Sequence, residues 1–221
     1  TSGETITDSG VITVAGTSSF TTDVNDKDII LNQSNAMSGN ITVSTAGTGG
    51  DVTIDNGTTA LGIQGTINGG LTVVNGAAIT DSDTLTVTGA SSFTIDTGSN
   101  HITLGTAALS GAIGVSTTGA SNFTLDNTTT AVNLGTVGVT GALSVTSGAA
   151  ITDSGVITVA GTATFVTDVN DIDITLNQSN AIAGALTFTT NTGGSNGADI
   201  TLNNGSTAIS LAGFATRGNL T

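Results

Sequence analysis

The sequence predicts an all-β chain that folds as a β-solenoid, and three observations lead to this fold class. Thr, Gly, Ser, Asn, Asp and Val are abundant in the 221 residues and Pro is absent. These abundant residues are mediocre or poor helix formers. One sequence unit recurs along the whole chain, and within each unit apolar residues alternate with Thr at a period of two.

The repeat unit is about 73 residues long and occurs three times. The opening TSGETITDSGVITVAGT returns as TSGAAITDSGVITVAGT at Thr146–Thr162, and AAITDSDTLTVTGASSFTID at Ala77–Asp96 matches the same element. The copies lie near 1–73, 74–145 and 146–221, with a three-residue insertion near Ser195 in the last. The first and third copies resemble each other most. Such repeats predict one modular unit over 1–221, belonging to a longer array.

Within each copy the strands are predicted at triplets of a large apolar residue, Thr and a second large apolar residue. A period of two is typical of a strand, with the apolar residues facing one side and Thr the other. Spacers of Gly, Asn, Asp and Ser separate the triplets and favour turns. The triplets are Ile12–Val14, Ile41–Val43, Val52–Ile54, Leu71–Val73, Leu85–Val87, Phe93–Ile95, Ile102–Leu104, Phe123–Leu125, Ile157–Val159, Ile174–Leu176, Leu186–Phe188 and Ile200–Leu202.

Short strands joined by short turns fit either an antiparallel sandwich or barrel, or a solenoid of parallel strands. The even strand length and spacing favour the solenoid, as does the scarcity of two-residue hairpin turns such as Asn56-Gly57. Its coils would stack about 4.8 Å apart around an apolar core. The coil length stays open, because a repeat could hold four coils of about 18 residues or three of about 24.

Charge and composition exclude several classes of protein. The net charge is −14, and Lys27 and Arg217 are the only Lys and Arg residues, so the basic footprint of a nucleic-acid binder is missing. Without Cys there is no disulfide framework and no thiolate metal site. The apolar runs are far shorter than the roughly 20 residues of a membrane-spanning helix.

The repeats of the chain resemble a known family. The phrase AVNLGTVGVTGALSVTSGAAITDSGVITVAGTATF (Ala131–Phe165), followed by DIDITLNQSNAIAGALTFTT (Asp171–Thr190), is similar to repeats of very large secreted bacterial proteins of the filamentous haemagglutinin type. The resemblance extends over essentially the whole chain in three copies. It implies a right-handed parallel β-helix, export across the outer membrane, and an adhesive or fibre-forming role.

Two Asp-rich segments are candidate calcium sites. TDVNDKDI (Thr22–Ile29) and TDVNDIDI (Thr167–Ile174) each bring three carboxylates and an Asn within six residues, and calcium prefers oxygen ligands. The glycine of a calcium loop is missing, and the second copy has Asp96–His101 there instead. We therefore expect solvated turns and no cofactor, with calcium as the alternative. GTGGD at Gly47–Asp51 hints at a calcium-binding β-roll but lacks its nonapeptide period.

No catalytic residue is predicted. His101 is the only His, so no repeated Ser–His–Asp set exists, and we expect a surface His. Asp81 and Asp83 could mimic the carboxylate pair of a glycosidase, because alternate strand residues point the same way. However, Asp81 belongs to a TDS turn shared with Asp8 and Asp153, which favours a polar turn. Basic residues of the kind used by polysaccharide lyases are almost absent.

The outward Thr residues provide an alternative function. Stacked coils would align them in ladders of the kind that bind ice, although Thr is also a good solvent-facing strand residue. Asn-x-Ser/Thr sequons are expected by chance in such a composition, and occur at Asn32, Asn40, Asn56, Asn122, Asn127, Asn177, Asn204 and Asn219.

We expect a structural shaft segment of an extracellular adhesin or fibre on the bacterial cell surface, supporting adhesion or matrix formation. Its expected partners are further repeats of the same chain or identical subunits stacked head to tail, and host or matrix glycans. No enzymatic activity is expected. The alternative is an ice-binding or polysaccharide-binding solenoid.

Overall fold

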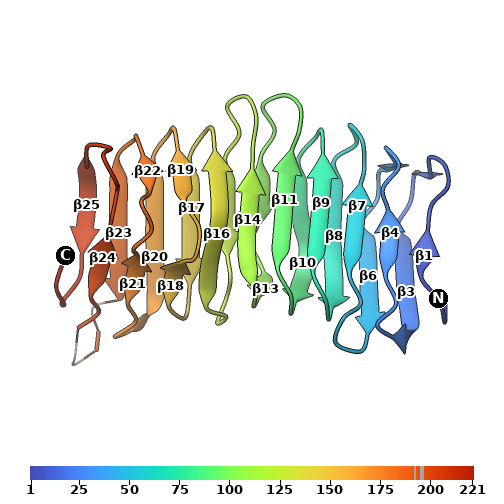
Figure 1. Cartoon of the computed structure of the whole chain (residues 1–221), viewed down its shortest axis with the longest axis horizontal. Helices are drawn as coiled ribbons and strands as arrows, with labels where there is room; N and C mark the ends of the chain where they lie inside the picture. Colours follow the sequence, from blue (N-terminus) through green and yellow to red (C-terminus); the bar gives the residue numbers. More distant parts are fainter. Residues whose placement is uncertain (192, 195–196) are drawn as a thin grey trace.

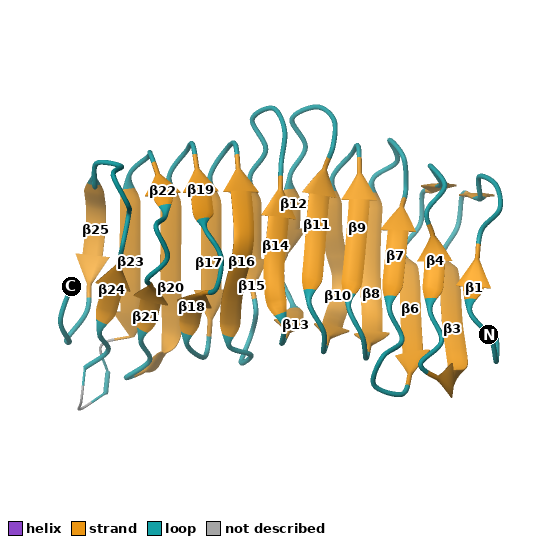
Figure 2. Ribbon diagram, viewed as in Figure 1, coloured by secondary structure: helices purple, strands orange, loops and turns teal. Residues whose placement is uncertain are grey.

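The chain winds into a parallel β-solenoid of about nine turns (Figure 1). The computed structural model describes residues 1–191, 193–194 and 197–221, so the insertion near Ser195 lies partly outside the described residues. Over the described residues every regular element is a strand and none is a helix (Figure 2). No helix there is long and apolar enough to cross a membrane.

Two long sheets form the two walls of the solenoid, and we call them the front and back sheets after their positions in Figure 1. The front sheet contains β1 (Ile6–Thr7), β4 (Ile29–Leu31), β7 (Val52–Asp55), β9 (Leu71–Asn75), β11 (Ser91–Ile95), β14 (Ala112–Ser116), β16 (Val132–Val139), β18 (Ile151–Asp153), β19 (Ile157–Val159), β21 (Ile174–Leu176), β22 (Ala181–Ile182) and β24 (Ile200–Leu202).

The back sheet alternates with the front sheet along the chain. It contains β3 (Ser18–Asn25), β6 (Ile41–Ala46), β8 (Leu61–Ile67), β10 (Ile79–Val87), β12 (Ile102–Leu104), β13 (Ala107–Leu109), β15 (Phe123–Asp126), β17 (Leu143–Ser147), β20 (Ala163–Asn170), β23 (Leu186–Asn191) and β25 (Leu211–Ala215). The short strands β2 (Thr13–Val14) and β5 (Ala36–Met37) pair separately.

All strand pairs described are parallel, which confirms the solenoid and excludes the hairpin-built sandwich. The coil is right-handed. In Figure 1 the front strands β9 and β11 run upward and the back strands run downward while the chain advances from right to left. Right-handed connection is the general rule for parallel strands.

Coil length varies along the solenoid. Successive ladder partners are 18 residues apart between Leu61 and Ile79 and 26 apart between Ile174 and Ile200. Seven ladder steps join β1 to β18, whose sequences are equivalent in the first and third copies. A repeat therefore spans three and a half coils, and neither of the two coil counts considered from the sequence is right.

The half coil places equivalent residues of successive copies in opposite sheets. Ile6 lies in the front sheet, its counterpart Ile79 in the back sheet, and Ile151 in the front sheet again. Equivalent strands of the first and third copies thus lie in the same sheet, and these two copies are also the most similar in sequence. Both walls have to accommodate the same repeat sequence.

The core lies between the two sheets and follows the triplet pattern. Strand residues alternate between buried and more exposed, and the inward Ile, Val, Leu and Phe side chains are almost entirely inaccessible to water. Phe165 and Phe188 stack on successive coils with ring centroids 5.4 Å apart. Full burial of one such side chain contributes roughly 1.5–3 kcal/mol.

Buried Asn residues close one corner of the coil in every copy. Asn56, Asn127 and Asn204 occupy equivalent positions with exposures of 0 to 3%. The side-chain oxygen of each Asn accepts the backbone N–H of one residue on a neighbouring coil, and its Nδ2 donates to the carbonyl of that residue. The Nδ2 also donates to a carbonyl of the turn that follows the Asn itself. These amides replace the ladder where the backbone turns, so buried peptide groups stay paired.

The turn after each buried Asn needs a left-handed residue. Gly57 and Gly205 have φ of 58° and 54°, and Thr128 takes the equivalent place with φ of 47°. In each case the backbone N–H of this left-handed residue donates to the side-chain oxygen of the residue two positions earlier. The conformation is unfavourable for a β-branched residue, but the Thr128 hydroxyl donates to the carbonyl of Ala107 on the adjacent coil.

Replacing Asn127 by Ala should destabilise the solenoid by at least about 2 kcal/mol, because each buried group left without a partner costs roughly 1–3 kcal/mol. Asn133→Ala is the matched control, since Asn133 is half-buried on the outer side of β16. Urea denaturation followed by circular dichroism should show a lower midpoint for Asn127→Ala alone. Equal shifts in the two variants would contradict the role of the buried amide.

Candidate functional site

The surfaces that could carry function are the acidic corners, one polar groove and the outer faces of the two sheets. At the corners, Asp8, Asp81 and Asp153 hold the same position in the three copies. Each carboxylate accepts two consecutive backbone N–H groups that follow 24 and 25 residues later, at 2.6–3.2 Å. Such charge-assisted bonds are stronger than neutral ones. These carboxylates hold the turn of the next coil, and two of them, Asp81 and Asp153, lie on strands β10 and β18.

In the first and third copies the same carboxylate also contacts a buried amide. Asn35 donates to Asp8 and Asn180 donates to Asp153, both at 2.7 Å. Asp81, the candidate glycosidase carboxylate, is held by backbone N–H groups, and its neighbour Asp83 accepts the N–H of Thr84 at 2.8 Å. Asp81 is therefore not in the turn expected from the sequence: it lies within β10, next to an irregularity of the ladder, and its carboxylate binds the turn at Gly105 and Thr106 of the next coil.

His101 occupies a second acceptor position that repeats through the chain. Its Nδ1 accepts the backbone N–H of Asn122 at 3.0 Å. In the other copies the equivalent residues Asp28 and Asp173 accept the corresponding N–H groups at 2.9 and 2.8 Å. The only His is on the surface, as expected, but it also has a structural role that was not predicted from the sequence. The sequence does contain a signal for this role, because His101 aligns with Asp28 and Asp173 of the other two copies.

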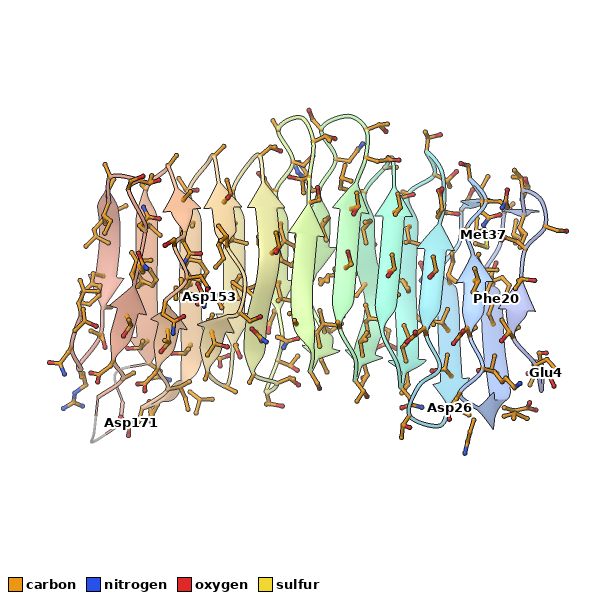
Figure 3. All side chains as sticks on the ribbon, viewed as in Figure 1. Glu4, Phe20, Asp26, Met37, Asp153 and Asp171 are labelled. Carbon is orange, nitrogen blue, oxygen red and sulfur yellow. The ribbon has the colours of Figure 1, made fainter. Side chains whose placement is uncertain are left out.

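The candidate calcium segments are turns only in part, because Thr22–Asn25 end strand β3 and Thr167–Asn170 end strand β20, and only the residues after them form turns. Asp26 and Asp171 both have φ of 59° and lie at the lower edge of the solenoid toward its two ends (Figure 3). Asp26 accepts the N–H groups of Thr48 and Gly49 at 3.0 and 2.8 Å, so the GTGGD segment is the loop that Asp26 caps. Within the described residues no group of three or more His, Cys, Asp or Glu side chains could hold a metal ion.

The hydrogen bonds around Asp8 affect its ionisation. Burial alone would raise the pKa of Asp8, but the bonds from the Asn35 side chain and from the backbone N–H groups of Gln33 and Asn32 outweigh it. The pKa of Asp8 is therefore lowered from its ordinary value. The ionised form is the one that fastens the two coils.

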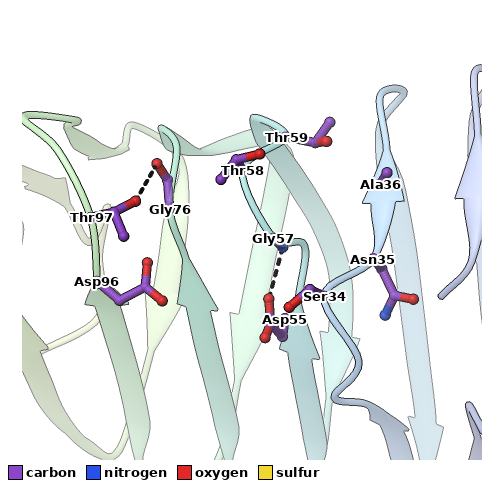
Figure 4. Close-up of a pocket in the computed structure, with 10 residues that line it drawn as sticks. All are labelled: Ser34, Asn35, Ala36, Asp55, Gly57, Thr58, Thr59, Gly76, Asp96 and Thr97. Carbon is purple, nitrogen blue, oxygen red and sulfur yellow. Dashed lines mark hydrogen bonds between the residues drawn. The ribbon is translucent and has the colours of Figure 1, made fainter. Parts of the chain in front are cut away.

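A polar groove of about 270 Å³ lies between turns of neighbouring coils (Figure 4). Part of its polar lining is already used by the turns, since Asp55 accepts the N–H of Gly57 at 2.7 Å and Thr97 donates to the carbonyl of Gly76 at 3.2 Å. The groove is lined by Ser34, Asn35, Ala36, Asp55, Gly57, Thr58, Thr59, Gly76, Asp96 and Thr97. It brings together none of the candidate catalytic residues.

The outer face of the back sheet carries a continuous column of hydroxyl side chains. It runs over six successive coils in direct register and comprises Thr80, Thr103, Thr124, Ser144, Thr164 and Thr187. We call it the Thr column. On the last of these strands a second outward Thr, Thr189, follows Thr187 at the i+2 position. Parallel strands space such side chains about 4.8 Å apart.

Three of the glycosylation sequons are closed to modification by burial. Asn56, Asn127 and Asn204 are the corner amides and have their side chains engaged with backbone groups. Five sequon Asn residues remain at least partly exposed, namely Asn32, Asn40, Asn122, Asn177 and Asn219.

The architecture defines a repeat protein of the β-solenoid class. A family model described as Repeats of unknown function (DUF5649) matches residues 1–44, 49–116 and 120–189, which is most of the chain. The chain therefore belongs to this family. No curated protein and no solved structure matches the chain.

His101→Asp should preserve stability while His101→Ala should lose about 0.5–1.5 kcal/mol, the usual net value of one hydrogen bond. The reason is that Asp performs the same task in the other two copies. Thermal denaturation of the three proteins at pH 7 measures the difference. Equal losses in both variants would show that the acceptor is not what matters at this position.

The stabilising effect of Asp8 should depend on pH. Because its pKa is lowered in the folded chain, its contribution is present above the ordinary Asp value of 3.8 and is lost as the pH falls through the lowered folded value. Wild type should therefore have a higher urea midpoint than Asp8→Asn at pH 7, and the gap should close in acid. A gap that does not change with pH would contradict this account.

Proposed function

We propose that this chain is a structural shaft segment of an extracellular bacterial adhesin or fibre, providing reach, stiffness and display at the cell surface. The observation that carries the proposal is the uninterrupted apolar core, which continues through every full coil between the two sheets. Each coil is joined to the next by parallel ladders, so bending would break hydrogen bonds and open the core together. The resemblance to haemagglutinin-type repeats points to the same role.

The distribution of polar groups also supports a shaft. The Asp side chains at the corners accept backbone N–H groups of adjacent coils, and His101 does the same. These Asp side chains thereby link successive coils through hydrogen bonds. The acidic residues also give the rod a net negative charge that keeps neighbouring rods apart. On this proposal the chain has no catalytic centre.

The shaft predicts that length scales with the number of repeats. Three and a half coils at about 4.8 Å each give about 17 Å per repeat. Small-angle X-ray scattering should show a rod of constant cross-section that lengthens by this amount when one 73-residue copy is added to the full chain. A cross-section that grows with the added copy would mean a globular packing of repeats and would contradict the proposal.

The Thr column supports a second candidate function, the binding of ice or of another regular surface. Its hydroxyl groups repeat in direct register from coil to coil, with a methyl group beside each except at Ser144. Thermal hysteresis of a freezing solution tests it, with Thr124→Leu in the column against Thr53→Leu on the front sheet. Hysteresis in the wild type that only Thr124→Leu abolishes would favour ice binding, whereas the shaft alone predicts none.

A further inference from the structure

We propose that His101 forms a pH-sensitive link between two neighbouring coils, which mild acid releases while the equivalent links of the other two copies stay closed. The link is the hydrogen bond in which Nδ1 of His101 accepts the backbone N–H of Asn122 at 3.0 Å. It lies in the interior of the solenoid, between the coils that carry β12 and β15. The inference goes beyond the shaft function, because it concerns how the coils themselves respond to pH.

His101 begins a relay of two hydrogen bonds that joins three successive coils. Asn122 donates its backbone N–H to the imidazole, and its own Oδ1 accepts the backbone N–H of Ala142 at 2.8 Å. The first and third copies contain the same relay with carboxylates as acceptors, at 2.6–2.9 Å. These relays run from Asp28 through Asp51 to Gly70 and from Asp173 through Asp199 to Asn219.

The acceptors of the three relays respond differently to acid. A neutral imidazole has one acceptor nitrogen, whereas a protonated imidazole has two N–H donors and no acceptor. Imidazole side chains change charge between about pH 5 and 8, and carboxyl groups do so in stronger acid. His101 is the only His of the chain. The first link of the middle relay is therefore the one whose chemistry changes in mild acid.

The direction of the effect follows from which form of the ring the fold accepts. In the folded chain the N–H of Asn122 points at Nδ1, so a proton on Nδ1 would place two donors against each other. In the unfolded chain the ring takes up the proton without this cost. The stabilising effect of the link is therefore present above the imidazole range and is lost as the pH falls through it.

No ion pair competes with this hydrogen bond for the imidazole. The three coils concerned span 76–139, and their charged side chains are Asp81, Asp83, Asp96 and Asp126. Among the described residues none of these carboxylates forms an ion pair with His101. Asp81, Asp83 and Asp126 accept backbone N–H groups instead, and Asp96 lines the polar groove. The bond to the following coil is thus the specific contact of the ring.

The link fastens one tall loop to the next. The loops that follow β11 and β14 are the two that rise highest at the upper edge of the solenoid (Figure 1). Two further hydrogen bonds join them, from the Thr118 hydroxyl to the carbonyl of Gly98 and from the N–H of Ala120 to Oγ of Ser99. Because these bonds and the ladder between β12 and β15 do not titrate, acid should loosen the second loop without opening the core.

NMR spectra of the wild type between pH 8 and 5 test the link directly. The amide resonance of Asn122 should shift with the same midpoint as the ring resonances of His101. Its protection from hydrogen exchange, corrected for the intrinsic rate, should fall about 2- to 10-fold, which corresponds to one hydrogen bond. The amides of Asp51 and Asp199 hold the same place in the other relays and should keep their protection.

Two outcomes of this titration would overturn the inference. One is an Asn122 amide that does not change while the His101 ring titrates. The other is an equal loss of protection at Asn122, Asp51 and Asp199, which would mean that acid loosens the coils in general. This test uses the wild-type chain and does not depend on the folding of any variant.

Substitutions of His101 separate the loss of the acceptor from other effects of acid. His101→Gln keeps a side-chain acceptor that does not titrate, so protection of the Asn122 amide should stay constant from pH 8 to 5. His101→Lys has donors and no acceptor, so it should show the low protection already at pH 8. Circular dichroism confirms that each variant retains its β-structure. A loss of protection in acid that persists in His101→Gln would contradict the proposal.

Discussion

The structure depends on the stacking of each coil on the next, with the paired strands of successive coils running parallel. Parallel pairing aligns equivalent strands, so inward Ile, Val, Leu and Phe side chains form continuous stacks between two walls. Pairing in the sheets would not suffice alone, because the backbone must also turn at each corner. There the amide of Asn127 and the carboxylate of Asp153, with their counterparts, supply the acceptors and donors that the ladders lack.

This requirement explains the unusual composition. An acidic chain with 8% charged residues would ordinarily be expected to use its carboxylates on the solvent side. Here Asp8 and its equivalents accept N–H groups of the next coil, where Asp suits the position because its short side chain reaches the adjacent backbone. The outer faces of the sheets are left to Thr and other small polar residues, which form a regular column on the back sheet.

The fold class, the repeats and the inward triplets could be predicted from the sequence, because a period of two and a self-match are local properties. The coil count could not, since one repeat holds three and a half coils and equivalent residues such as Ile6 and Ile79 change sheets. The role of Asp153 was hidden for a related reason. Its partners lie 24 and 25 residues ahead, in a chain whose coil length varies from 18 to 26 residues.

The most direct measurement of the central claim is the distance between spin labels on two residues of the Thr column, at Thr80→Cys and Thr187→Cys. Five ladder steps separate the two residues. Double electron–electron resonance should therefore give a narrow distribution of label-to-label distances centred near 24 Å, at about 4.8 Å per step. A broad distribution, or a distance that five stacked parallel coils cannot produce, would contradict the solenoid and every conclusion drawn from its register.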